Sequence, residues 1–114
     1  MVISYSSFPV PSGYPQNVRA ELITSAKIFV IWDPVLEIER NGMIVRYGVQ
    51  FNQSTLNEVS LSNFLVTEAP NLMLVLQEFV EYSIAVNSYN SVGAGPFSPA
   101  VTIQTLEDSE WGLC

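Results

Sequence analysis

The chain has 114 residues, of which 48% are hydrophobic and 13% are charged, and its formal net charge is -7. This length fits one domain with its own core, and the composition argues against disorder. The acidic balance, with only 4 scattered lysines and arginines, excludes the cationic face that binding to nucleic acid or to an anionic membrane surface requires.

The cysteine and histidine content limits the chemistry of the chain. Its one cysteine is Cys114, so no internal disulfide can form, and a zinc site would need more thiolates or histidines. The chain has no histidine, which removes the commonest general base and metal ligand. Cys114 also lacks the neighbouring base and cation that activate a thiolate. We therefore expect no catalytic residue, no metal ion and no cofactor.

Three strands are predicted in the first half of the chain, at residues 16–22, 26–32 and 43–51. The second strand is stopped by Asp33-Pro34, because proline has no amide hydrogen to donate to a sheet. Asn41-Gly42 is a turn dipeptide suited to positive φ. The side chains that we expect to face the core are Val18, Ala20, Leu22, Ile28, Val30, Trp32, Ile44, Tyr47, Val49 and Phe51.

Four more strands are predicted at residues 56–64, 71–76, 82–89 and 100–105. The alternation is clearest in the strand at 82–89, where Tyr82, Ile84 and Val86 face inward. Short strands at this spacing predict an all-β fold, a seven-stranded antiparallel β-sandwich. The glycine-rich stretch after residue 90 lacks the Lys-Ser/Thr ending of a phosphate-binding loop, so we interpret it as a turn. No apolar run is long enough to cross a bilayer, and we expect no direct membrane insertion by this segment.

Several short motifs, taken in order and at their spacings, resemble those of the fibronectin type III domain. They are P-x-N-V at 15–18, W-D-P at 32–34, G-x-I-x-x-Y-x-V-x-F at 42–51, Y-x-I-x-V at 82–86 and N-x-x-G-x-G-P-x-S at 90–98. The resemblance covers residues 14–107 and implies an immunoglobulin-like antiparallel β-sandwich of fibronectin type III topology. Residues 1–13 would then be an N-terminal tail, and residues 108–114 a C-terminal linker or chain end.

The resemblance also implies roles for individual residues. The spacing of Leu76 and Tyr82 is similar to that of a tyrosine corner, in which the phenol hydroxyl bonds back to the upstream backbone. Gly93 and Gly95 would let the loop after the sixth strand adopt positive φ, and Pro96 would end that turn. The expected structural core is Trp32, Tyr47, Leu76, Tyr82, Ile84 and Val86.

Two outward positions of the second strand, Phe29 and Ile31, are apolar where this family commonly has Thr or Ser. In such a sandwich the second strand pairs with the fifth, and the fifth turns apolar side chains outward in either phase. The two phases expose Met73 and Val75, or Leu72 and Leu74. We expect an apolar patch here, which is covered by the N-terminal tail or by a partner or neighbouring domain, unless the phase of the strand is misread. The apolar residues of the tail are Ile3, Tyr5, Phe8 and Val10.

Other polar features are candidates for binding or modification. The loop after the second strand carries Glu37, Glu39 and Arg40, which would bind a cation or a basic partner, or simply be solvated. The triplet that begins at Asn52 is an N-glycosylation sequon. In the loop after the sixth strand, the candidate interaction residues are Asn90, Ser91 and Val92. That loop has no Arg-Gly-Asp motif, so integrin recognition by that route is unsupported.

The resemblance implies a non-catalytic protein-interaction and spacer module from the extracellular part of a plasma-membrane receptor or adhesion protein. The run Y-x-I-x-V-x-S-x-N-x-x-G-x-G-P is similar to those in receptor-type tyrosine phosphatases, whose enzymatic activity would reside in other domains. Its partners would be another protein or neighbouring domains of the same chain, and the sequence does not fix the oligomeric state. The alternative is an intracellular, cytoplasmic structural module of a filament-associated protein. A small hydrolase with a Ser or Cys nucleophile is the weakest hypothesis.

Overall fold

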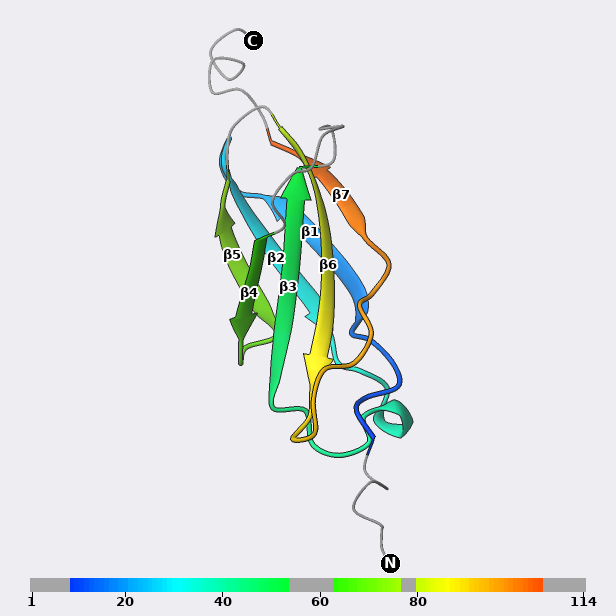
Figure 1. Cartoon of the computed structure of the whole chain (residues 1–114). Coiled ribbons are helices and arrows are strands. Elements are labelled where there is room, and N and C mark those ends of the chain that lie inside the picture. The colour runs from blue at the N-terminus through cyan, green and yellow to red at the C-terminus, as the bar shows by residue number, and fades with distance from the viewer. Residues whose placement is uncertain (1–8, 54–62, 77–79, 106–114) are drawn as a thin grey trace, which may run out of the picture.

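The computed structural model describes residues 9–53, 63–76 and 80–105, which form two antiparallel sheets packed face to face (Figure 1). One sheet has the strand order β1-β2-β5, and the other has the order β4-β3-β6-β7. The predicted all-β sandwich is therefore confirmed. The strands are β1 Gln16–Leu22, β2 Lys27–Asp33, β3 Arg46–Gln53, β4 Asn63–Thr67, β5 Asn71–Val75, β6 Glu81–Tyr89 and β7 Val101–Gln104.

The core lies between the sheets and follows from the alternation of apolar residues along each strand. In the four-stranded sheet, Val49 of β3 pairs with Val86 of β6, and both side chains point inward. Each fully buried aliphatic side chain contributes roughly 1.5–3 kcal/mol relative to an exposed position. The buried cluster is Ile28, Val30, Trp32, Val49, Phe51, Leu74, Tyr82, Ile84 and Val86. Tyr47 and Leu76 are half-buried and pack against this cluster.

The rings of Trp32 and Tyr47 meet near one end of the core, edge to face, with their centroids 5.4 Å apart. This is a favourable geometry for two aromatic rings between sheets. The segment between Leu76 and Tyr82 that would form a tyrosine corner includes residues 77–79, which lie outside the described residues. The Tyr82 ring itself is buried.

The fourth strand extends further along the chain than predicted, to Thr67. β4 spans Asn63–Thr67 and pairs with β3 so that Leu65 is opposite Val49. The prediction placed this strand at 56–64, and residues 54–62 lie outside the described residues. Phe64, Leu65 and Val66 are consecutive apolar residues, so alternation does not show which side of this strand faces the core, and the register with β3 fixes it.

The phase of β5 is fixed by its register with β2, in which Ile28 is opposite Leu74. Leu74 is buried, whereas Met73 and Val75 are 46% and 72% exposed on the outer face. The phase that turns Met73 and Val75 outward is therefore the observed one.

The connection from β2 to β3 contains one turn of 3₁₀ helix, η2 (Glu37–Glu39). Asn41 and Gly42 follow this helical turn in the same connection, and their φ angles are 53° and 122°. The positive φ predicted for this dipeptide is thus observed. Within the described residues, no helix has the length and apolar character that a membrane span requires.

Candidate functional site

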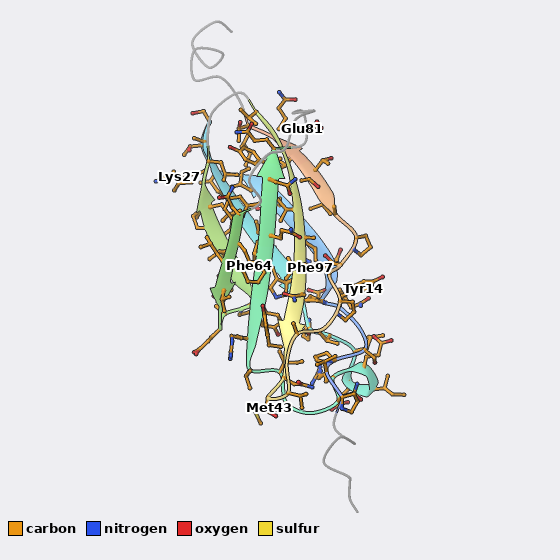
Figure 2. The ribbon with its side chains drawn as sticks, in the orientation of Figure 1. Tyr14, Lys27, Met43, Phe64, Glu81 and Phe97 are labelled. Atoms are coloured by element: carbon orange, nitrogen blue, oxygen red, sulfur yellow. The ribbon has the colours of Figure 1, made fainter. Side chains whose placement is uncertain are left out.

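One end of the sandwich, here called the loop pole, brings together three segments that are far apart in the sequence (Figure 1). They are the entry segment (residues 9–13), the β2–β3 loop (residues 34–45) and the β6–β7 loop (residues 90–100). In Figure 2, Met43 marks the loop pole, and Lys27 and Glu81 mark the opposite end. At the loop pole, loops rather than strands form the surface.

The side chain of Asn90 joins these three segments. Its Nδ2 donates to the carbonyl oxygens of Pro9, Arg40 and Asn41 at 3.0, 3.2 and 2.9 Å. Its Oδ1 accepts from the backbone N–H groups of Val92 and Gly93 at 2.9 and 3.1 Å. The side chain uses both its donor and its acceptor group on backbone atoms. Asn90 therefore fixes how the entry segment and the two loops sit against each other.

Two further contacts hold the entry segment in place. Asn41 Nδ2 donates to the carbonyl oxygen of Val10 at 2.9 Å. The backbone N–H of Ser12 donates to the carbonyl oxygen of Glu39 at 2.9 Å. Main-chain and side-chain hydrogen bonds from separate loops thus reach three of the five residues of the entry segment. The chain enters the domain along a defined path.

The glycines of the β6–β7 loop serve this packing, and the prediction that they adopt positive φ is wrong. Among the described glycines, only Gly42 has positive φ. A Cβ on Gly95 would instead lie 2.8 Å from the carbonyl oxygen of Pro11, and one on Gly93 would lie 3.2 Å from Val10 Cγ1. Glycine is needed here because the entry segment approaches the loop backbone closely.

The structure corrects the role predicted for Asn90, which is buried, whereas its neighbours Ser91 and Val92 are exposed. Asn90 was a candidate interaction residue, but its side chain is turned inward and it is only 4% exposed. An amide with its hydrogen bonds made inside the protein cannot also contact a partner. Ser91 and Val92, the other two candidates in this loop, are exposed at its tip.

The surface of the loop pole is apolar to a degree that the sequence reasoning did not find. Ile38 of η2 is 86% exposed and Met43 of the β2–β3 loop is 81% exposed, the two highest values among the large apolar side chains described. Leu36 and Val92 are each about half exposed at the same pole. The sequence did hold a signal for this surface: these apolar residues stand in a predicted loop, where burial in the core cannot account for their apolar character.

A pocket of about 460 Å³ opens beside these side chains, between the end of β2 and the start of β3. Arg40 Nε donates to the carbonyl oxygen of Val35 at 2.8 Å, which holds the guanidinium at the pocket wall. Burial raises the pKa of the Tyr47 phenol above its usual value, and the nearby charge of Arg40 partly opposes this. The lining residues are Pro34, Val35, Arg40, Gly42, Met43, Ile44 and Tyr47.

The acidic side chains of the β2–β3 loop do not assemble into a metal centre. Glu37 is exposed and Glu39 is half-buried near Gly13. Within the described residues, no group of three or more His, Cys, Asp or Glu side chains is placed to hold a metal ion.

The outer face of the three-stranded sheet is where the sequence predicts an apolar patch. Phe29 and Ile31 are half-buried there, with Phe29 opposite Met73 in the neighbouring strand. Val75, at 72% exposure, lies at the end of this face. Val10, which was expected to help cover the patch, is bonded at the loop pole instead. The other apolar tail residues, Ile3, Tyr5 and Phe8, lie outside the described residues.

The outer face of the four-stranded sheet is partly covered by an aromatic pair. Phe64 of β4 and Phe97 of the β6–β7 loop meet edge to face with centroids 6.2 Å apart (Figure 2). A Cβ on Gly48 would overlap the Phe64 ring, so glycine leaves the space for it. Asn52 is half-buried on this face, opposite Ser83 of β6.

Strand order, the inward aromatic residues and the loop pole define an immunoglobulin-like β-sandwich of the three-plus-four type. The family model of the fibronectin type III domain matches residues 13–104. The chain belongs to this family.

Proteins from several animals resemble this chain in sequence or in structure. Receptor-type tyrosine-protein phosphatase F of Mus musculus is 38% identical over 98 residues, which cover 85% of this chain and 5% of that protein. Cell adhesion molecule Dscam1 of Drosophila melanogaster is 34% identical over 94 residues, covering 77% of this chain and 5% of that protein. The solution structure of the third fibronectin III domain of human KIAA0343 protein superposes with a TM-score of 0.79 at 25% identity, covering 94% and 92% of the two chains.

Proposed function

We propose that this chain is an extracellular protein-interaction and spacer module of a multidomain cell-surface receptor or adhesion protein. The similarity to a receptor-type phosphatase and to a cell adhesion molecule carries the proposal. The chain spans about 5% of the length of these relatives, so their activities as whole proteins depend largely on other parts. The fibronectin type III domain itself is non-catalytic. In a phosphatase parent, the enzymatic activity would reside in other domains.

The module would act through surface complementarity rather than through chemistry at a catalytic site. Two apolar surfaces support this role: the loop pole, with Ile38 and Met43, and the outer face of the three-stranded sheet, with Met73 and Val75. Exposed apolar side chains that gather on one surface are typical of protein-binding sites. The sequon at Asn52, on a different face, would leave both surfaces free of a glycan.

The extracellular location can be tested in cells that produce the parent protein. An antibody raised against this domain should label intact, unpermeabilised cells, and N-glycosidase should lower the mass of the parent. Asn52→Gln should remove one glycan, whereas the control Asn63→Gln, at an exposed asparagine outside any sequon, should remove none. Labelling only after permeabilisation, with no glycan at Asn52, would instead support the intracellular structural module.

A further inference from the structure

The four-stranded sheet ends at β4, an edge strand that carries no charge and no proline. Within the described residues, β4 pairs with β3 and with no other strand, so one row of its backbone N–H and C=O groups faces away from the sheet. Edge strands are commonly protected from pairing with another chain by lysine, proline or a β-bulge. The sequence of β4 is N-F-L-V-T, and its register with β3 is regular. The backbone of β4 is therefore open to a further strand.

The side chains along β4 are apolar and exposed on both faces of the strand. Phe64, Leu65 and Val66 are 44%, 45% and 49% exposed. Leu65 lies opposite Val49, which is fully buried between the sheets, so the described strands do not close the core over Leu65. Phe64 and Val66 alternate with Leu65 and point to the outer face. A further strand beside β4 would cover side chains on both faces while its backbone pairs with that of β4.

The sequence of β4 is complementary to itself. In an antiparallel pair of two β4 strands centred on Leu65, this leucine lies opposite the same leucine of the other copy. Phe64 then lies opposite Val66, which is a favourable aromatic and β-branched pair, and Asn63 lies opposite Thr67, so polar side chains meet polar ones.

The other sheet and the charge of the chain make β4 the preferred edge for such a pair. The same centred pairing of β5, which is also an edge strand, would set the polar Asn71 against the apolar Val75. Two copies of a chain with a formal net charge of -7 repel each other. Pairing through β4 sets no like charges opposite each other, because this strand has none.

We infer that two copies of this chain associate edge to edge through antiparallel β4 strands, which joins their four-stranded sheets into one continuous sheet. The two-fold pair uses the β4 edge of both copies, so association stops at the dimer. The contact involves one short strand from each copy, and we expect a weak dimer with a Kd on the order of 0.1 mM. The inference adds to the proposed function a third surface and a partner, a second copy of this chain.

The position of β4 leaves the chain ends and the sequon clear of this contact. The entry segment lies at the loop pole, β7 ends at the opposite end, and β4 runs along the side (Figure 1). Asn52 lies one residue past the pair of Phe51 and Asn63 that ends the register of β3 with β4, so a glycan there would project beyond the paired strands. In an antiparallel pair, the two chains run in opposite directions, as in molecules that meet from two facing cells.

Sedimentation equilibrium over a concentration series up to about 1 mM should show a monomer and dimer in exchange. Leu65→Glu sets two carboxylates opposite each other and Leu65→Lys two ammonium groups, so each variant should raise the dimer Kd at least about tenfold. An equimolar mixture of the two variants should dimerise again, because the centred register sets Glu opposite Lys. The matched control is Val75→Glu on β5, another exposed apolar side chain, which should leave the Kd unchanged.

A second measurement uses the wild-type chain, because Leu65 borders the core and its variants must first be shown by thermal melting to fold. Isotope-filtered NMR on a mixture of ¹³C-labelled and unlabelled chains should show contacts between the Phe64 ring of one copy and the Val66 methyl groups of the other. A chain that stays monomeric throughout the series overturns the inference. So does a dimer that lacks these contacts or that only Val75→Glu weakens. In each case the proposed function, which cell-surface labelling tests, still stands.

Discussion

Replacing Asn90 with alanine should destabilise the domain by about 3 kcal/mol, measured as the loss in free energy of unfolding. The side chain provides two N–H donors to three carbonyl oxygens and accepts two backbone N–H groups. Four such bonds at about 1 kcal/mol each give an upper value near 4 kcal/mol, and water will satisfy part of the exposed loop backbone in the variant. For a domain of this size, the loss corresponds to a fall in Tm of roughly 10–20 °C.

Urea unfolding followed by tryptophan fluorescence measures this loss, because Trp32 is buried in the core. The matched control is Ser91→Ala, which changes an exposed side chain next to Asn90 and should alter stability by less than about 0.5 kcal/mol. A loss of less than about 1 kcal/mol for Asn90→Ala would mean that water replaces these hydrogen bonds at little cost. The idea that Asn90 organises the loop pole would then be refuted.

Three further substitutions test other features of the structure. Gly95→Ala should lower the free energy of unfolding by about 1–3 kcal/mol, because its Cβ would lie 2.8 Å from a carbonyl oxygen of the entry segment. Gly93→Ala should lower it clearly less, because the nearest atom to its Cβ would be 3.2 Å away. Equal falls in Tm would contradict the close approach. The unfolded chain releases the Tyr47 proton at its ordinary pKa and the folded chain only at higher pH. Stability should therefore fall as pH rises above the ordinary tyrosine pKa of about 10. Tyr47→Phe should flatten that fall in urea unfolding measured on both sides of this pH, and identical slopes would exclude the effect. Phe64→Ala and Phe97→Ala should show a coupling energy of about 0.5–1.5 kcal/mol in a double-mutant cycle, whereas additive losses would show that the ring contact adds nothing.

The sandwich could be predicted because apolar alternation directly reports which side of a strand is buried. Tyr82, Ile84 and Val86 alternate with polar or small residues, and they are buried as the pattern indicates. The position of β4 could not be predicted in the same way. Its residues are exposed on an edge of the sheet, so the apolar pattern carries little information about burial. Pairing with β3 decides where this strand lies.

The loop pole could be predicted only in part. The sequence indicated a turn at Asn41-Gly42, because local backbone conformation depends on local residue types. It did not reveal that Asn90 is buried, since its partners are backbone carbonyls of segments 49 to 81 residues away. The glycines of the β6–β7 loop were misinterpreted for the same reason: the atoms that exclude a side chain belong to the entry segment.

The path of the chain through the sandwich determines how the domain responds to tension. The entry segment lies at the loop pole, and β7 ends beside Glu81 at the opposite end (Figure 1). A force that pulls these two points apart therefore acts along the strands, across the hydrogen bonds that join β1 to β2 and β7 to β6. Each row of bonds must shear as a unit instead of opening one bond at a time. This arrangement gives a strand-built spacer mechanical resistance without a covalent cross-link.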